Sequence, residues 1–379
     1  MPKPSYDVLV IGAGGVGSAA LYQLAKRGIR AAALDRFHPP HKHGSSHGQT
    51  RIIRQAYFEH PSYVPLLQRS YELWREIEAV SQRSLYHEVG LVEIGPPDGI
   101  VLPGVIRAAA QFNLEIDRYS AAEATSLFPQ FLFPDDHTVV FERRAGYLKV
   151  EDCVAAFLDI AQQHGAELIA DSEVFRWSRD GAGFCVSTST GEYRAAKLII
   201  AGGPGAASLL SELNIPLHLL RKHMHWYEID DLRLQESSGS PCFFFESSHG
   251  YFYGFPELAP GEGLKVAEHG GGETLASPWN YDHADDPEDR QRIEAFLQRS
   301  IPGVSQRSKR HETCLYTMTP DENFLLGLYP GDDQIALAAG LSGHGFKFTA
   351  VLGEALADLI EQGISSLPID FLSPSRFAR

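Results

Sequence analysis

The sequence predicts an α/β protein with a Rossmann-like dinucleotide-binding domain, joined to a second α+β domain built on an antiparallel sheet. Three observations support this fold class. A glycine-rich turn follows a β-rich apolar run near the N-terminus. Strand and helix patterns alternate again in residues 150–219 and 320–379. The intervening residues 85–149 and 220–319 are instead rich in aromatics, prolines and short β-like runs.

The N-terminal unit has the order strand, turn, helix, strand. Residues 6–11 form an apolar strand, Gly12-Ala-Gly-Gly-Val-Gly17 forms the turn, and residues 18–27 read as a helix ended by Gly28. A second strand, residues 31–34, ends at Asp35. Gly12, Gly14 and Gly17 would let a pyrophosphate approach the helix N-terminus, and Asp35 would bind a ribose hydroxyl. The alternative is a glycine-lined packing turn, and the motif does not separate FAD from NAD.

The other nucleotide-fold pieces follow later in the chain. A helical pattern runs from Val150 to Gly165, and strands are expected at 168–174, 184–188 and 197–201. The last piece is a strand at 334–339, a glycine-rich turn at 340–345 and a helix ended by Gly363. We therefore expect a discontinuous cofactor domain of residues 1–84, 150–219 and 320–379. A substrate domain of residues 85–149 and 220–319 completes the chain.

Composition excludes several classes of partner. The 379 residues are 44% hydrophobic and 21% charged, typical of a globular protein. A net charge of −15 disfavours nucleic acids and anionic membranes. Four scattered cysteines give neither a disulfide framework nor a zinc motif. The glycines within the N-terminal apolar run argue against a signal peptide, so we expect a cytoplasmic protein.

Two C-terminal motifs point to chemistry. Cys314 closely follows Lys309, Arg310 and His311, a setting that favours a reactive thiolate. The turn Gly343-His-Gly-Phe-Lys347 carries a cation and leads into a helix, whose positive end would attract an anion. Together the motifs predict a covalently held cofactor and a carboxylate substrate.

The loop of residues 37–54 has three interpretations. His41, His43 and His47 would form a metal site, although they lack nearby acidic or thiol partners, and we predict no metal. The loop would otherwise be a polar surface segment, or a glycine-hinged loop that brings His47, Arg51 and Arg54 to a redox cofactor.

Three segments resemble the monomeric sarcosine oxidase family: Gly44-Ser-Ser-His-Gly-Gln-Thr-Arg-Ile-Ile-Arg54, Thr313-Cys-Leu-Tyr-Thr-Met-Thr-Pro-Asp-Glu322 and Leu341-Ser-Gly-His-Gly-Phe-Lys347. The similarity extends over essentially the whole chain. It implies a glutathione-reductase-type FAD-binding domain, in which a small β-meander interrupts the nucleotide fold. It also implies FAD attached by a thioether between the flavin 8α-methyl carbon and the sulfur of Cys314.

The resemblance assigns roles to individual residues. Lys265 would lie near flavin N5 and promote the reaction with oxygen, Arg54 and Lys347 would clamp the substrate carboxylate, and Tyr316, beside Cys314, would contact the substrate. The catalytic set is Lys265, Arg51, His47, His269 and Tyr253. The cofactor contacts are Gly12, Gly14, Gly17, Asp35, Arg36, Ser45, His47, Thr50, Arg51, Cys314, Gly343, His344, Gly345 and Lys347. We expect His344 to act mainly on the conformation of its loop.

The predicted function is oxidation of the C–N bond of a secondary or cyclic amino acid, with FAD as cofactor and O2 as acceptor, by a monomer. The sequence does not choose between sarcosine, N-methyl amino acids, pipecolate and proline. A dehydrogenase that passes electrons to a protein or quinone, and a flavin-binding sensor without activity, remain alternatives. One departure stands out, because many relatives have Ala-Gly-x-Trp where this chain has Ala201-Gly-Gly-Pro-Gly205.

Overall fold

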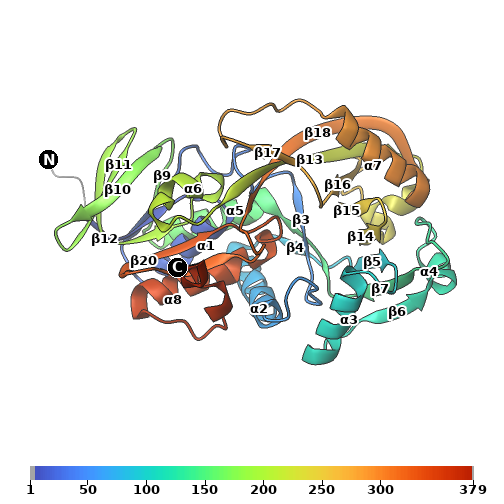
Figure 1. Ribbon diagram of the computed structural model, residues 1–379, viewed down its shortest axis with the longest axis horizontal. Helices are drawn as coiled ribbons and strands as arrows, with labels where there is room; N and C mark the ends of the chain where they lie inside the picture. The colour runs from blue at the N-terminus through green and yellow to red at the C-terminus, as the bar shows by residue number, and fades with distance from the viewer. Residues whose placement is uncertain (1–4, 378–379) are drawn as a thin grey trace.

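The computed structural model describes residues 5–377, so the first four and last two residues of the predicted cofactor domain lie outside it. Two large sheets lie side by side, as Figure 1 shows. A small three-stranded sheet lies between them in this view. Within the described residues, no helix is both long enough and apolar enough to span a bilayer.

The first sheet has eight strands in the order β10-β11-β12-β1-β2-β9, with β20 beside β12 and β19 beside β20. The core of this sheet is parallel, because β1 pairs in parallel with β2 and β12, and β20 with β12. The meander β10-β11-β12 is antiparallel. The strands are β1 (Ser5–Ile11), β2 (Ala31–Leu34), β9 (Glu167–Ile169), β10 (Val174–Asp180), β11 (Gly183–Thr188), β12 (Gly191–Ile200), β19 (Leu325–Tyr329) and β20 (Asp332–Ala339).

Helices bury the apolar face of this sheet. The helix α1 (Gly15–Lys26) packs against α5 (Val150–Gln163) and α8 (Thr349–Gln362), and α2 (Tyr63–Ser81) packs against α8. Gly353 allows the close approach of α8, because a Cβ there would lie 2.7 Å from the Cβ of Ala19. Gly363 ends α8 with φ +76°. The expected parallel α/β unit is therefore present.

The second sheet has nine strands, most of them antiparallel, in the order β17-β13-β16-β15-β14-β5-β7-β6, with β18 beside β13. One pair, β5 with β14, is parallel. The strands are β5 (Leu91–Gly95), β6 (Asp117–Ser120), β7 (Thr138–Glu142), β13 (His218–Ile229), β14 (Cys242–Ser247), β15 (Gly250–Phe255), β16 (Leu264–Glu268), β17 (Glu273–Leu275) and β18 (Val304–Met318). Its helices are α3 (Val101–Phe112), α4 (Ala121–Leu127) and α7 (Pro287–Ser300).

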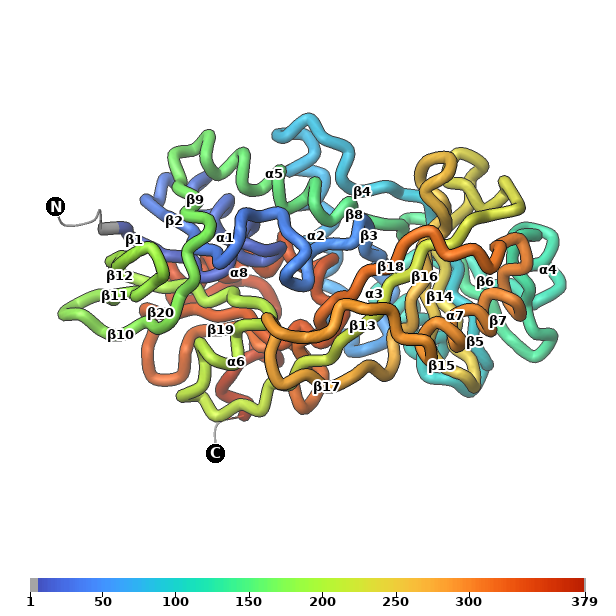
Figure 2. Tube along the Cα trace, turned by 90° about the horizontal axis from the view of Figure 1, so that it is seen from above, coloured from blue at the N-terminus to red at the C-terminus, as the bar shows by residue number. Residues whose placement is uncertain are grey.

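The small sheet connects the two large ones. Its strands are β3 (Thr50–Ile53), β4 (Tyr86–His87) and β8 (Gly146–Lys149), with β8 in the centre. In Figure 2 the long strands β13 and β18 run side by side from the second sheet toward the first. The far end of β18, which carries Cys314, thereby reaches the nucleotide-binding side.

Two expected elements differ in detail. The strand expected at 168–174 is divided into β9 and β10, because the chain turns at Asp171, whose φ is +52°. The helix expected directly after the 340–345 turn begins later than expected. A single 3-10 turn, η5 (Phe346–Phe348), precedes α8, which starts at Thr349.

Candidate active site

The glycine turn after β1 is packed too tightly for other residues. A Cβ on Gly12, whose φ is +94°, would lie 2.4 Å from the carbonyl oxygen of Ala201. A Cβ on Gly17 would lie 1.8 Å from the oxygen of Gly12. Gly14 is the N-cap of α1 and faces Ser46, whose hydroxyl accepts a hydrogen bond from the Gly15 N–H at 3.0 Å. The turn therefore presents backbone at the start of a helix, as a pyrophosphate requires.

Asp35 is fixed beside this turn. Its Oδ2 accepts from the Ala13 N–H at 2.7 Å, and its Oδ1 accepts from the Phe37 N–H at 3.0 Å and contacts His41 Nε2 at 3.1 Å. Next along the chain, Arg36 pairs with Glu173 at 2.6 Å. Both residues line a cavity, so an acidic side chain is held where a ribose hydroxyl would bind.

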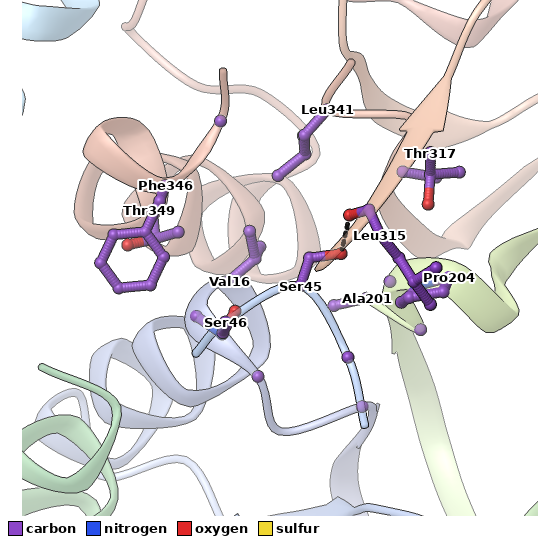
Figure 3. Close-up of a pocket in the computed structure, with 18 of the residues that line it drawn as sticks. Val16, Ser45, Ser46, Ala201, Pro204, Leu315, Thr317, Leu341, Phe346 and Thr349 are labelled. Atoms are coloured by element: carbon purple, nitrogen blue, oxygen red, sulfur yellow. Dashed lines mark hydrogen bonds between the residues drawn. The ribbon is translucent and has the colours of Figure 1, made fainter. Parts of the chain in front are cut away.

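That cavity, of about 280 Å³, runs from the glycine turn to the end of β18. Figure 3 shows its walls, which come from α1, the loop before β3, the turn after β12, β18 and the start of α8. Ser45 Oγ donates to the Leu315 carbonyl at 2.7 Å and so ties the loop to β18 (Figure 3). The predicted residues that line the cavity are Gly12, Gly14, Asp35, Arg36, Ser45, Arg51, Arg54, Tyr253, His269, Cys314, Tyr316, Gly343, His344, Gly345 and Lys347. His47, Thr50 and Lys265 lie buried behind its wall, and Gly17 lies inside the turn.

Cys314 is a buried thiol among cationic groups. Arg51 Nη2 lies 3.2 Å from its Sγ. Burial alone would raise the pKa of the Cys314 thiol, but Arg51, His47 and Lys265 lower it to about 6. At neutral pH the sulfur is therefore mainly a thiolate, which is the nucleophilic form.

The sequence predicted a reactive thiolate because of Lys309, Arg310 and His311, but other residues lower the thiol pKa. Alternation along β18 places Lys309 and His311 on the face opposite Cys314. Arg310 lies on the same face but stacks on Trp226 at 4.2 Å and pairs with Glu312 at 2.7 Å. The cations that lower the thiol pKa come instead from the loop before β3, from β3 itself and from β16.

Glu312 is a site residue that sequence reasoning missed. Its Oε2 lies 3.4 Å from His47 Nδ1, and the other imidazole nitrogen, Nε2, has no hydrogen-bond partner among the described residues. Burial opposes the charged imidazole, but Cys314 and Glu312 raise the pKa of His47. The acid–imidazole contact of a nucleophile-activating triad is therefore present, whereas in this structure His47 acts on Cys314 through its charge and not through a hydrogen bond of Nε2. The position of Glu312 two residues before Cys314, and so on the same face of the strand, was the sequence signal that could have identified it.

Lys265 is fully buried on β16, and its ammonium contacts the loop before β3. Its Nζ donates to the carbonyl oxygens of Gly48, at 2.5 Å, and Thr50, at 2.9 Å, and to Thr50 Oγ1 at 3.3 Å. Burial and the charge of Arg51 lower the pKa of Lys265. Three acceptors match the three donors of an ammonium group, however, so these contacts favour the charged form.

Arg54 and Lys347 approach the same end of the cavity. Arg54 is not a free cation, because Nη2 binds both carboxylate oxygens of Glu59 at 3.0 and 3.1 Å and Nη1 pairs with buried Glu93. Lys347 Nζ donates to the His344 carbonyl at 3.0 Å and to Tyr57 Oη at 3.5 Å. Burial and the charge of Arg54 lower the pKa of Lys347 to about 7. Glu59 and Glu93 were not predicted, since their pairing depends on the tertiary fold.

The remaining predicted residues surround this end. Tyr316 Oη lies 3.5 Å from His269 Nδ1, and burial lowers the pKa of His269 to about 3. The Tyr253 ring centre lies 6.3 Å from that of His269. Gly343 is required beneath Tyr316, because a Cβ at its φ of +81° would lie 2.3 Å from the ring. A Cβ on Gly345 would lie 2.5 Å from Leu341.

His344 holds its loop by both ring nitrogens. Nδ1 lies 2.6 Å from Tyr57 Oη, and Nε2 lies 3.1 Å from the Glu322 carbonyl oxygen. A carbonyl only accepts, so Nε2 carries the proton and Nδ1 accepts from the tyrosine. Burial and Lys347 lower the pKa of His344 to about 3.

The three loop histidines have different partners. His41 contacts Asp35, His43 stacks on Phe37 with ring centres 4.0 Å apart, and His47 faces Glu312. A separate group lies on the opposite face of β13 and β18 from Cys314. There, the ligand atoms of His223, Asp285 and His311 lie within 4.8 Å of one another. His223 Nδ1 is 2.8 Å from His311 Nε2, while Asp285 pairs with Arg290.

A dinucleotide turn, a buried thiol with a lowered pKa and two cations in one cavity fit an oxidoreductase that binds a dinucleotide cofactor. Comparisons with known proteins agree. Residues 7–359 match the family described as FAD dependent oxidoreductase. Monomeric sarcosine oxidase from Streptomyces avermitilis is 38% identical over 99% of both chains. N-methyl-L-tryptophan oxidase from Salmonella dublin is 34% identical over 99% of this chain and all of the relative.

A solved structure gives the same result. An unusual amino acid oxidase essential for nikkomycin biosynthesis superposes with a TM-score of 0.87 at 26% identity, covering 98% of each chain. The chain belongs to the monomeric sarcosine oxidase family of FAD-dependent oxidoreductases. The predicted fold class and dependence on FAD are thereby confirmed. The close-packed glycine turn, the fixed Asp35 and the Cys314 thiolate all fit this cofactor.

Proposed function

We propose that the chain oxidises the C–N bond of a secondary or cyclic amino acid and uses O2 as the electron acceptor. The amine loses two electrons and two protons to become an imine, and O2 gains them to become H2O2. Water then hydrolyses an acyclic imine, whereas a cyclic imine can persist. FAD supplies the two-electron relay between these half-reactions. The observation that carries the proposal is the single cavity joining the dinucleotide turn, Cys314 and the cations Arg54 and Lys347.

The substrate carboxylate would bind between Arg54 and Lys347. Glu59, which also lines the cavity, now occupies one side of the Arg54 guanidinium. An incoming carboxylate would therefore replace Glu59, while buried Glu93 keeps its own contact and fixes the guanidinium plane. Exchange of one carboxylate for another conserves the charge of the pocket, so binding does not require a bare arginine.

The substrate nitrogen must be unprotonated, because its lone pair assists removal of electrons from the neighbouring carbon. Arg51 and Lys347 line the cavity, and their positive charge disfavours a protonated substrate amine there. His269, with its lowered pKa, is a neutral imidazole at working pH and adds no charge. These groups would select the neutral amine of an amino acid whose carboxylate is held at Lys347.

We further propose that Cys314 carries the covalent attachment, in which a C–S bond would replace one C–H bond of the flavin 8α-methyl group with O2 as the final two-electron oxidant, and that Lys265 assists the oxygen reaction. For Cys314 the support is its lowered pKa and the Arg51 contact. For Lys265 the support is a buried ammonium held by three oxygens next to β3, because a fixed positive charge favours the formation of superoxide from O2. The family name of the relatives leads us to propose a monomer.

An anaerobic flavin-bleaching screen tests the proposal. Purified protein would be mixed without oxygen with sarcosine, N-methyl-L-tryptophan, L-pipecolate or L-proline, with glycine as the primary-amine control. We expect at least one secondary amine to bleach the flavin absorbance, and admission of air to restore it with one H2O2 per turnover. Bleaching without peroxide would instead support a dehydrogenase. No bleaching by any of these amines would contradict an amino acid oxidase and favour a sensor.

A further inference from the structure

Residues 276–286 link β17 to α7 and extend from the second sheet toward the cofactor sheet. Figure 1 shows this segment reaching over toward β9 and α6 (Ala206–Leu209). Residues of β13 and β18 anchor the segment to the second sheet. Arg221 Nη1 donates to the Asp282 carbonyl at 2.7 Å, and His283 Nδ1 lies 2.9 Å from Thr313 Oγ1. The segment is therefore fixed to the second sheet while it extends toward the cofactor sheet.

Trp279 lies at the point where this segment meets the cofactor side. Its ring lies over the guanidinium of Arg36 at 4.6 Å and contacts Phe37 edge-on, with ring centres 5.9 Å apart. It also covers Gly205, since a Cβ there would lie 3.1 Å from the indole. Trp279 lines the same cavity as Asp35 and Arg36 but keeps 39% of its surface exposed. An indole thus borders the ribose-binding end of the cavity.

This contact bears on the departure from the Ala-Gly-x-Trp pattern. The turn after β12 has no tryptophan of its own, and its glycines leave room for an aromatic ring. Trp279, 74 residues after Gly205 in the sequence, places an aromatic ring against this turn from the segment between β17 and α7. The tryptophan of that pattern would align with Pro204, and a Cβ at the next residue, Gly205, would lie only 3.1 Å from the Trp279 indole, so a side chain at position 205 would crowd the ring.

We propose that Trp279 is a cofactor-binding residue that closes over the adenosine end of FAD. Asp35 marks this end as the ribose site. Arg36 is held between the carboxylate of Glu173 and the indole face, so its planar guanidinium is presented in one orientation. An indole of this kind stacks on a purine or on a guanidinium already covering one. The segment retains the dinucleotide while the bond at Cys314, at the opposite end, forms.

The proposal depends on FAD binding, which family membership shows, and not on the amino acid oxidised. The test uses the full-length Cys314→Ser protein freed of flavin, because binding is then reversible. ADP and FMN serve as probes of the two halves of the site, and calorimetry gives each dissociation constant. Trp279→Ala should weaken ADP binding about 5- to 100-fold, as expected for loss of one stacking partner. FMN binding should change less than twofold.

Two further variants keep the test decisive. Phe175→Ala removes another exposed aromatic, on neighbouring β10, that does not line the cavity, so ADP binding should not change. Trp279→Phe should recover part of the affinity, because a smaller ring still stacks. An unchanged dissociation constant for ADP in folded Trp279→Ala would overturn the proposal. Equal losses for ADP and FMN would do so too, since they would indicate general damage to the site.

Discussion

The thiolate character of Cys314 can be tested by replacing Arg51 with methionine. Arg51 Nη2 lies 3.2 Å from the sulfur, and the two charges attract by ~5 kcal/mol at an effective dielectric constant of 20. That energy corresponds to ~4 pKa units, so its loss would return the thiol pKa from about 6 to its ordinary value of 9.0 or above. At pH 7.5 the thiolate fraction would then fall from ~97% to ~3%.

Two measurements follow the change. The pH dependence of alkylation by iodoacetamide gives the pKa of Cys314 in flavin-free protein, provided that the Cys314→Ser protein is subtracted as background. The fraction of flavin that stays with acid-precipitated protein, followed over time during incubation with saturating FAD, gives the rate of attachment. We expect Arg51→Met to slow attachment ~30-fold at pH 7.5, in proportion to the thiolate fraction.

Lys309→Met is the matched control. Lys309 is closer to Cys314 in sequence than Arg51 is, but it lies on the opposite face of β18, 3.8 Å from Glu228. Its removal should leave the thiol pKa near 6. If Arg51→Met kept both a thiol pKa near 6 and the wild-type attachment rate, the reasoning from the Arg51 contact would be refuted. Equal effects of the two variants would point to net charge and not to proximity.

Three other predictions concern oxygen, substrate and stability. Lys265→Met should slow reoxidation of reduced flavin by O2 ~100-fold or more while anaerobic reduction changes little; stopped-flow absorbance would measure both, and wild-type reoxidation would contradict the role. Glu59→Gln should lower the KM for a carboxylate substrate several-fold, because a neutral amide competes less for Arg54; a raised KM would show that Glu59 assists binding. His223 and His311, whose pKa burial lowers to about 4, stay neutral when folded but protonate near pH 6.5 when unfolded. The free energy of unfolding should therefore fall as pH drops from 6.5 to 4, and urea titrations of His223→Gln should show a shallower decline; an unchanged slope would exclude this linkage.

Local patterns carried much of the fold prediction. The unit from β1 to Asp35 was predictable because its turn, helix and second strand are consecutive and each has its own sequence signal. In the turn, that signal is a set of glycines at positions where the backbone leaves no room for a Cβ. The same holds for α8, which Gly363 ends as expected. The proposed domain boundaries and the roles of individual site residues stay predictions.

The environment of each functional group was less predictable, because it depends on residues far apart in sequence. Cys314 owes its lowered pKa to Arg51, 263 positions away, and not to its sequence neighbours. Sequence reasoning selected cations by type and motif but could not assign their partners. Buried Glu93 has no motif, and only the packing of β5 against the loop after β3 brings it to Arg54.

Partner assignment changes which cation should hold the substrate. Three of the predicted cations already contact carboxylates: Arg36 with Glu173, His47 with Glu312 and Arg54 with Glu59 and Glu93. Lys347 instead hydrogen-bonds to a carbonyl and a hydroxyl, and the more distant Glu59 and Glu93 offset its charge only in part. That is why burial and Arg54 can lower its pKa to about 7. A substrate carboxylate placed there would supply the missing negative charge and raise this pKa, so above pH 7 binding takes up a proton at Lys347. We therefore propose that Lys347 is the primary anion site and that Arg54, already paired, would orient the carboxylate that Lys347 attracts.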